Sequence, residues 1–334
     1  MSSAHLAVDG GNSKTVAVVV DQAGLVLGRG RGGCGDIYGA ASPRAAVEAV
    51  TGAIGQALVG AGLEPPDVDN AVLRLAGADW PEDARYWTEQ LADLVPGLRR
   101  VEVGNDALAS LRLVDRAGVG LCVTVGTGPA VGARSAAGRE AWTGLWVFDD
   151  LGGGGLGRSS FEAVMRAWMG TGPSTLLTPA LLDMYGAPDE PTLHHQFTRR
   201  FDARPDTERW RAARLVLQIA EQGDPVALAI VERQARALVG YAGWVAREVG
   251  EDLADGNLPV LLNGSVVTSE HPAMRRALLS DFADLYPGAV VSVSRGTPLA
   301  GAVLDALASG GVALDDGLVD RVVGTAHPAD FLIT

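Results

Sequence analysis

The sequence predicts an α/β protein with two domains, mixed sheets and a cleft between the domains. The length of 334 residues favours two domains, because one domain takes roughly 150 residues. Strands alternate with helices after an antiparallel start, which is typical of mixed sheets. The third observation is a repeat, since Ala7-Val8-Asp9-Gly10-Gly11 and Val123-Thr124-Val125-Gly126-Thr127 both run from an apolar strand into a glycine turn.

The first half of the chain opens with three predicted strands. Residues 6–8, 15–20 and 25–28 are apolar or β-branched and are separated by turn residues, which predicts an antiparallel meander. The spacing of apolar residues further along predicts three helices and two strands. The helices cover 43–59, 81–94 and 107–114, and the strands cover 70–76 and 101–103.

The second half repeats this opening and adds a long helical stretch. Strands are predicted over 120–125 and 130–134, around a turn that contains Gly126-Thr127-Gly128-Pro129. Residues 160–250 are mainly helical, with 173–205 irregular, and Asp224-Pro225 is typical of the start of a helix that runs to Val249. The remaining predicted elements are strands over 258–262 and 289–293 and helices over 271–285 and 297–308.

The composition excludes several classes of function. Lys+Arg 27 against Asp+Glu 40 give a net charge of −13, which repels polyanions, so we expect neither nucleic acid nor an anionic membrane as a partner. Cys34 and Cys122 are too few for a disulfide framework or a four-cysteine zinc site. No apolar run approaches the ~20 residues of a membrane span, and the first is too short for a signal peptide, so we expect a cytoplasmic protein.

The turn at residues 9–15 is the first candidate site. Gly10 and Gly11 let backbone N–H groups approach an anion closely, and Asn12, Ser13 and Thr15 add neutral donors. Asp9, at the end of a strand, could hold Mg²⁺ through water. The alternative is an ordinary Asp-Gly hairpin, and the spacing is not that of a Walker A loop.

Two further glycine turns could serve the same ligand. Thr127 and Gly128 form a small turn with a hydroxyl, and two such hairpins facing each other could hold one polyphosphate from both sides. Asn263-Gly264-Ser265 ends a predicted strand, where α/β sheets present backbone to a nucleotide. Small residues at 298–302 would let a helix pack closely against a neighbour.

Asp106 is the best placed candidate for a catalytic base. It lies between a predicted strand and a predicted helix, where a carboxylate can point into the cleft between domains. A phosphoryl-transfer enzyme needs such a carboxylate near the acceptor hydroxyl. The alternative is that Asn105 or Asp106 only caps the helix.

Together and in this order, these motifs resemble those of the actin-like (sugar kinase/Hsp70/actin) ATPase superfamily. Within it, the chain is similar to the N-acetylglucosamine kinase-like branch, which includes the BadF/BadG-type ATPases. The matching segments run from residue 9 to residue 302. They are 9–15 as phosphate-1, 105–107 as connect-1, 126–128 as phosphate-2, 262–265 as adenosine and 298–302 as connect-2.

The resemblance implies two RNase-H-like domains, each with a mixed five-stranded sheet flanked by helices, that close on MgATP. We expect residues 1–115 with 313–334 in the smaller domain, and 116–312 in the larger, with a helical insertion around 160–250. Asp106 would act as base and Asp9 would hold Mg²⁺ through water. The resemblance implies ATP contacts from Gly10, Gly11, Asn12, Ser13, Lys14, Thr15, Thr127, Gly128, Asn263, Gly264 and Ser265.

The sequence departs from the family pattern in three places. Pro129 stands where relatives usually have Ser, so phosphate-2 loses one hydroxyl. Asp36 stands where N-acetylglucosamine kinases tend to have an Asn that contacts the sugar. Asp150 best matches the family's sugar-contacting Asp, with an extra acid, Asp149, before it.

These acids would crowd the sugar site. We expect Asp36, Asn105, Trp146, Asp149 and Asp150 to join Asp106 there. A protonated amine among carboxylates makes strong charge-assisted hydrogen bonds, so we predict phosphoryl transfer to the 6-hydroxyl of D-glucosamine. The alternative is that Asp149 faces solvent and Asp36 caps a turn, and Trp146 is as well explained by core packing.

Other functions remain open at this point. A kinase of N-acetylglucosamine or another hexose is the nearest rival. A BadF-type activator would need cysteine ligands for an iron–sulfur cluster between subunits, and a sugar-sensing regulator is a third possibility. The sequence also allows a homodimer, and it leaves open whether residues 152–155 form a hinge or a close approach to the nucleotide.

Overall fold

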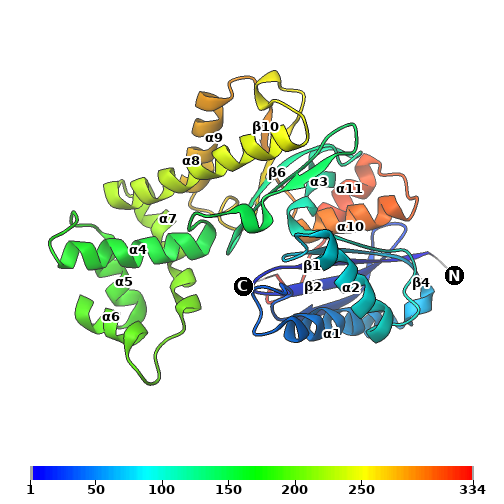
Figure 1. The fold of residues 1–334 in the computed structure, drawn as a ribbon, viewed down its shortest axis with the longest axis horizontal. Helices are drawn as coiled ribbons and strands as arrows, with labels where there is room; N and C mark the ends of the chain where they lie inside the picture. Colours follow the sequence, from blue (N-terminus) through cyan, green and yellow to red (C-terminus); the bar gives the residue numbers. More distant parts are fainter. Residues whose placement is uncertain (1–2, 333–334) are drawn as a thin grey trace.

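Two five-stranded sheets with the same strand order form the framework of the molecule (Figure 1). The computed structural model describes residues 3–332. The first sheet has the order β3-β2-β1-β4-β5, and the second has the order β8-β7-β6-β9-β10. The first sheet comprises β1 (Ala4–Gly10), β2 (Thr15–Asp21), β3 (Val26–Gly32), β4 (Val68–Leu75) and β5 (Val101–Asn105). The second comprises β6 (Gly120–Val125), β7 (Pro129–Arg134), β8 (Glu140–Trp142), β9 (Val260–Asn263) and β10 (Val291–Val293).

The direction of the strands repeats as well. Strands β1, β2 and β3 pair antiparallel, and β4 and β5 join β1 in parallel. Strands β6, β7 and β8 pair antiparallel in the same way, and β9 and β10 join β6 in parallel. The predicted α/β class, the mixed sheets and the duplicated opening are therefore confirmed.

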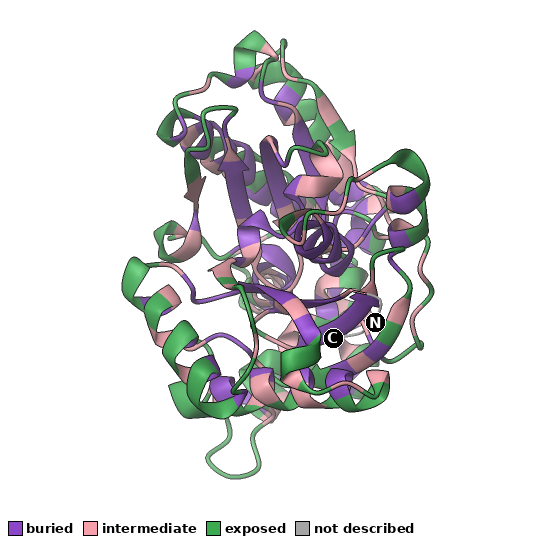
Figure 2. Cartoon of the chain, turned by 90° about the vertical axis from the view of Figure 1, so that its right-hand side faces the viewer, coloured by how far each residue is buried: buried purple, intermediate pink, exposed green. Residues whose placement is uncertain are grey.

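Helices cover both faces of the first sheet because its strands are apolar on both sides. Leu6 and Val8 belong to a core with α1 (Pro43–Ala61) and α2 (Pro81–Leu94). Ala7, between them in sequence, belongs to a second core with α10 (Pro298–Ser309) and α11 (Asp316–Val323). Successive strand residues point to opposite faces, and β1, β2 and β4 are buried along almost their whole length, whereas Figure 2 shows exposed residues mainly on helices and loops.

Strand β3 lies unusually close to α1. A Cβ atom on Gly28 would lie 2.0 Å from the carbonyl oxygen of Ala57, and one on Gly30 would lie 1.9 Å from that of Ala53. Only glycine fits at these two positions of the strand. The strand ends at Gly32, whereas the sequence predicted its end at residue 28.

The second sheet carries the helical insertion. It contains α4 (Gly152–Trp168), α5 (Leu177–Tyr185), α6 (Glu190–Thr198), α7 (Ala213–Glu221) and α8 (Pro225–Glu248), and α9 (Ala273–Leu285) follows. The predicted start of α8 is confirmed, since the Asp224 carboxylate accepts hydrogen bonds from the backbone of Val226 and Ala227. Figure 1 shows α4, α5 and α6 extending away from both sheets. Among residues 3–332, no helix is long and apolar enough to span a membrane.

Two predictions about helices are wrong. The stretch 173–205 is not irregular, because α5 and α6 lie within it and Asp189 caps α6 through the Thr192 N–H. The predicted helix 107–114 is broken into a 3₁₀ turn (Asp106–Leu108) and α3 (Leu111–Val114). A Cβ on Gly301 would lie 2.1 Å from the Ala109 carbonyl oxygen, so close packing of α10 constrains this segment.

Helix α10 packs on the first sheet rather than the second. Its buried face, which includes Leu299, Val303 and Leu307, shares a core with Ala7 and Val18. We therefore propose that the C-terminal part of the smaller domain begins near Pro298 instead of at residue 313.

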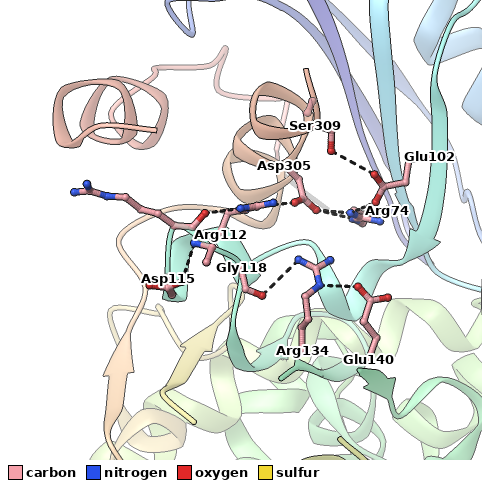
Figure 3. A network of polar contacts seen from close by, with 12 residues as sticks. Arg74, Glu102, Arg112, Asp115, Gly118, Arg134, Glu140, Asp305 and Ser309 are labelled. Carbon is pink, nitrogen blue, oxygen red and sulfur yellow. Dashed lines mark hydrogen bonds and ion pairs between the residues drawn. The ribbon is translucent and has the colours of Figure 1, made fainter. Parts of the chain in front are cut away.

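A buried ion network joins α10 to the segment that leads into the second domain (Figure 3). The Arg74 Nε donates to Asp305 Oδ2 at 3.0 Å, and the Arg112 Nε donates to Asp305 Oδ1 at 2.9 Å. Arg74 also pairs with Glu102 of β5 at 2.6 Å. Although burial raises the pKa of Asp305, the charges of Arg74 and Arg112 outweigh it and hold that pKa below its ordinary value. The network therefore fixes α3 and α10 at the seam between the domains.

Candidate active site

Two glycine turns, one from each sheet, face each other across a cleft. The β1–β2 turn presents Ser13, and the β6–β7 turn presents Thr127, with their side-chain oxygens 3.4 Å apart. Both turns line a cavity of about 400 Å³ that also contains Asp9, Asp106 and Ser265. Equivalent turns of a duplicated fold thus converge on one space, which backbone N–H groups and neutral hydroxyls surround.

A second, larger compartment adjoins this cavity. It has a volume of about 780 Å³ and lies between Trp210, Arg211 and Arg214 on one side and the segment from Ser265 to Glu270 on the other. Ser13, Lys14, Gly126, Thr127 and Ser265 line both compartments, so the two form one continuous cleft. The sequence analysis missed its tryptophan and arginine wall, which the helical insertion supplies.

The glycine run at 152–155 begins α4 against the second turn. The Gly153 N–H donates to the Gly126 carbonyl at 2.8 Å, and the Gly154 N–H donates to that of Thr127 at 2.8 Å. Gly152 has a φ of +72°, and a Cβ there would lie 2.7 Å from the Thr127 carbonyl oxygen. The glycine run therefore packs closely against the turn at 126–128. Its hydrogen bonds to this turn restrict the freedom that a hinge would need.

Several residues expected to contact ATP instead shape the turns. Gly10 is buried, and a Cβ there would lie 2.6 Å from Leu75 Cδ2. Thr15 is fully buried and its hydroxyl donates to the Gly33 carbonyl at 3.0 Å. Neither residue lines the cleft, so we propose that Gly10 and Thr15 shape the first turn instead of binding ATP directly. Gly11, Asn12, Ser13 and Lys14 do line it.

The turn after β9 is fixed from within. The Asn263 side chain is buried, donates to Ser110 Oγ at 2.8 Å and accepts from the Gly264 N–H at 2.7 Å. Gly264 has a φ of +92°, and a Cβ there would lie 2.5 Å from the Val125 carbonyl oxygen. Asn263 therefore holds the turn in place. Within this turn, Ser265 is the residue that lines both compartments.

Four carboxylates lie near one another, and two of them, Asp9 and Asp106, line the cleft. Burial, followed by the negative charges of Asp9, Asp79 and Asp36, raises the pKa of Asp106 to about 8. Burial raises the pKa of Asp9 to about 6, although Lys14 opposes the shift. Burial, followed by the charges of Asp36 and Asp83, raises the pKa of Asp79 to about 6. Such a cluster favours a bound cation, proton or hydroxyl donor.

Asp79 is the functional candidate that the sequence analysis missed. It follows β4, a parallel strand beside β1, and α/β sheets bind ligands beyond the carboxyl ends of their strands. The residue could have been found by reading past the strand predicted at 70–76.

Asn105 acts on this site through Asp79. Its Nδ2 donates to Asp79 Oδ1 at 2.8 Å, and its Oδ1 accepts from the Ala107 N–H at 3.0 Å. The side chain is buried with both ends of the amide engaged. We therefore propose a positioning role for Asn105 in place of the expected direct contact with the acceptor, and Asn105, not Asp106, is the cap of the turn.

Asp36 caps a turn and also acts on the charges of two neighbouring acids. Its Oδ1 accepts from the Tyr38 N–H at 2.8 Å, so it caps a turn. Its carboxylate also acts electrostatically on Asp79 and Asp106. Gly77, with a φ of +74°, leaves room for it, since a Cβ there would lie 2.2 Å from Asp36 Oδ1.

Asp149 and Asp150 do not join the cluster. Asp149 is exposed and its Oδ2 accepts from the Tyr241 hydroxyl at 2.8 Å. Asp150 forms an ion pair with Arg158, whose Nε donates at 2.6 Å. The charges that perturb Asp106 come from Asp9, Asp79 and Asp36 instead. Of the acids expected around Asp106, Asp149 and Asp150 are therefore absent, and Asp79 is present in addition.

Trp146 lies at the edge of the carboxylate cluster, between aromatic neighbours. Its ring is edge-on to Trp80, the residue after Asp79, with centroids 5.9 Å apart. It is 49% exposed, so it is not part of the core.

The residues fit Mg²⁺ held mainly by a nucleotide. In the described part of the chain, no group of three or more His, Cys, Asp or Glu side chains is arranged to bind a metal alone. Mg²⁺ is commonly held by one or two carboxylates with phosphates and water. Asp9 lines the cavity beside both glycine turns and its charge is disfavoured by burial, so a cation there would relieve that cost.

Comparison with solved structures identifies the fold. A candidate N-acetylglucosamine kinase from Chromobacterium violaceum superposes with a TM-score of 0.68 at 23% identity, over 91% of this chain and 98% of that one. A ROK family glucokinase from Streptomyces griseus, solved with glucose and AMPPNP, gives a TM-score of 0.59 at 19% identity over the same shares. This chain has the actin-like ATPase fold.

Sequence comparisons are consistent with this fold. Residues 6–146 of this chain match the BadF/BadG/BcrA/BcrD ATPase family, and this match spans less than half of the chain. The N-acetyl-D-glucosamine kinase of Dictyostelium discoideum is 24% identical over 91% of this chain and 98% of its own length. The match to the ATPase family ends at Trp146, so it includes the first turn, Asp106 and the second turn.

Proposed function

We propose that this protein is an ATP-dependent sugar kinase of the N-acetylglucosamine kinase type. The observation that carries the proposal is the position of Asp106, which shares one cavity with both glycine turns. A carboxylate beside a polyphosphate cradle is the arrangement that phosphoryl transfer to a hydroxyl requires. The names of the relatives in sequence and in structure support the same reaction.

In this proposal each turn binds part of the nucleotide. The hydroxyls of Ser13 and Thr127, with the backbone N–H of Gly128, hold the phosphates, and Lys14 adds positive charge. Ser265 and the wall at Trp210 and Arg214 border the compartment for the nucleoside. Asp9 would hold Mg²⁺ together with the nucleotide, and the ion would neutralise charge at the transferring group.

Asp106 orients the acceptor and takes its proton. The hydroxyl oxygen of the sugar forms a bond to the γ-phosphorus as the bond from that phosphorus to the leaving ADP oxygen breaks. The hydroxyl proton passes to the Asp106 carboxylate. In this proposal Asp36 and Asp79 accept hydrogen bonds from the other hydroxyls, and the hydrogen bond from Asn105 fixes Asp79.

Two acceptors compete for the site, and N-acetylglucosamine has the better support. It is the sugar in the names of the Dictyostelium discoideum and Chromobacterium violaceum proteins. D-Glucosamine, with transfer to its 6-hydroxyl, is favoured by the carboxylates Asp36, Asp79 and Asp106, since an ammonium group offsets their mutual repulsion. The case for D-glucosamine no longer includes Asp149 and Asp150, which bond to Tyr241 and Arg158.

The activator function is less well supported. Cys122 is fully buried in β6, and burial raises the pKa of its thiol to about 12, which disfavours the thiolate that a cluster ligand needs.

An assay of ADP release over a panel of sugars tests the proposal. We expect ATP- and Mg²⁺-dependent turnover with at least one hexosamine and a loss of about 10²–10⁴ in kcat for Asp106→Asn. The ratio of kcat/KM for glucosamine and N-acetylglucosamine, repeated with Asp36→Asn, decides the acceptor. Undiminished turnover by Asp106→Asn, or no turnover with any sugar, contradicts the proposal.

A further inference from the structure

An open aromatic groove lies between the segment 146–149 and α8. It has a volume of about 580 Å³ and is lined by Trp146, Phe148, Asp149, Ala237, Gly240, Tyr241 and Trp244. A site for a small ligand has a volume of roughly 300–1,000 Å³. Trp146 is 49% exposed and Phe148 is 83% exposed, and an exposed apolar patch of this kind marks a binding surface.

The groove lies close to Asp79, because Trp146 contacts the residue after Asp79 and follows Gly144, which also approaches Asp79. Trp80 follows Asp79, and Trp146 lies two residues after Gly144, where a Cβ would be 2.1 Å from Asp79 Oδ1. Trp80 contacts Trp146 edge-on, and Trp146 contacts Trp244 in the same way with centroids 6.4 Å apart. A ligand that leaves the cluster on this side therefore meets tryptophan first.

The chemistry of the groove suits a sugar ring. Aromatic walls favour the apolar face of a pyranose, and a few fixed polar groups set its orientation. The Tyr241 hydroxyl donates to Asp149 Oδ2 at 2.8 Å and accepts from the Phe148 N–H at 3.0 Å, so this acid is held in place to accept from a hydroxyl. The residues that line the groove include no cationic side chain, which disfavours an acidic partner.

We propose that the groove is a subsite for a second pyranose ring, so that the acceptor is a disaccharide or the end of a longer glycan. The first ring lies at Asp106 and Asp79, and the second stacks on Trp146 and Trp244. This inference rests on the proposed kinase function, because it assigns the first ring to the acceptor position.

Gly240 provides a variant that fills the groove without removing a contact. A Cβ at Gly240 would meet no atom within 4 Å, so Gly240→Leu projects a side chain into open space. Leucine is also a better helix former than glycine, so the variant keeps α8 folded. Gly52→Leu is the matched control, because Gly52 is an exposed helical glycine in α1 with equally open space.

The experiment compares a monosaccharide with its β-1,4-linked dimer, using N-acetylglucosamine and glucosamine and the dimer of each. We expect kcat/KM of the wild-type protein to be about tenfold higher for a dimer. Gly240→Leu and Trp244→Ala should remove this preference while leaving monosaccharide turnover unchanged, and Gly52→Leu should keep it. A preference that survives both groove variants, or a wild-type preference for the monosaccharide, overturns the inference.

Binding without ATP separates this inference from the proposed function. Calorimetric titration should show that Gly240→Leu weakens binding of the dimer by about tenfold and spares the monosaccharide. If no sugar is phosphorylated, the kinase proposal fails, and this titration still tests the second ring. If Gly240→Leu or Trp244→Ala instead changes the oligomeric state measured by light scattering, the groove is an interface between copies and the subsite is refuted.

Discussion

At the scale of single residues, Asp106 combines chemical use with an electrostatic cost. Burial and three neighbouring acids raise its pKa to about 8, above the ordinary value near 4, so the folded protein holds a proton that the unfolded chain releases. Stability from this proton is complete below about pH 4 and is lost as the pH rises through about 8.

Asp106→Asn should therefore stabilise the protein while it stops the reaction. The neutral amide removes the repulsion, so we expect Tm at pH 8 to rise by about 2 °C or more, with a smaller rise at pH 5. Thermal unfolding at the two pH values measures this. Asp93→Asn, at an exposed site in α2, should change neither Tm nor turnover. A lower Tm for Asp106→Asn at pH 8 would show that the carboxylate is not strained.

The same cluster predicts how activity depends on pH. A general base must be deprotonated, so kcat/KM for the sugar should rise between pH 6 and 9. Asp79 is one of the charges that raises the pKa of Asp106. Asp79→Asn should thus move the midpoint of this rise to lower pH, whatever it does to the absolute rate. An unchanged midpoint would mean that the two carboxylates do not interact.

The sequence located these residues unevenly, for physical reasons. Asp106 was predictable because a strand end beside a helix places it in the cleft. Asp149 and Asp150 were not, because neighbouring acids near a glycine run can point in several directions. In the structure, Tyr241 and Arg158 decide that direction, and both come from later helices.

At the scale of elements, tight packing of glycine positions the second turn. Gly152 combines a positive φ with a 2.7 Å approach of its Cβ position to Thr127, whereas Gly170 has a similar φ of +71° and open space around it. Gly152→Ala and Gly170→Ala therefore carry similar backbone strain, and only the first displaces the turn at 126–128.

Gly152→Ala should raise KM for ATP by about tenfold, and Gly170→Ala should leave it unchanged although both variants lose some stability. Steady-state kinetics at saturating sugar measure the effect. Equal values of KM in the two variants would show that contact between α4 and the turn is not needed for nucleotide binding.

The seam between the domains depends on ion pairs of Asp305 that no local sequence pattern predicts. Asp305 lies in an otherwise apolar helix and is 3% exposed, between Arg74 and Arg112. Helix α10 was predictable from its alanine-rich sequence, but its partner sheet was not, because the contact joins residues far apart in the chain.

Asp305→Asn should destabilise the protein by about 3–5 kcal/mol, because it leaves the Arg112 guanidinium without its carboxylate partner and the buried Arg74 with Glu102 alone. Urea unfolding at pH 7 measures this. Arg44→Gln, which breaks the exposed Arg44–Glu48 pair, is the control and should cost less than about 1 kcal/mol. A similar small cost for Asp305→Asn would mean that water replaces the lost charge.

At the scale of the whole molecule, duplication explains the site. Two copies of one sheet order place two equivalent turns at the same cleft, and each copy has its own core. The sequence predicted the two copies from their matching openings. It could not predict the groove on α8, because Trp80, Trp146 and Trp244 meet only when both domains and the helical insertion are in place.

A nucleotide that touches both turns must couple the two domains. A ligand that binds only the native state at about 100 times its Kd stabilises it by about 2.7 kcal/mol. If a non-hydrolysable ATP analogue with Mg²⁺ bridges the turns, amide hydrogen exchange should slow in β1 and β2 and equally in β6 and β7. Thr127→Val removes one hydroxyl from one side only, and it should weaken protection in both sheets together. Protection confined to one sheet would show that the nucleotide is held by a single domain, and the paired turns would then have no shared ligand.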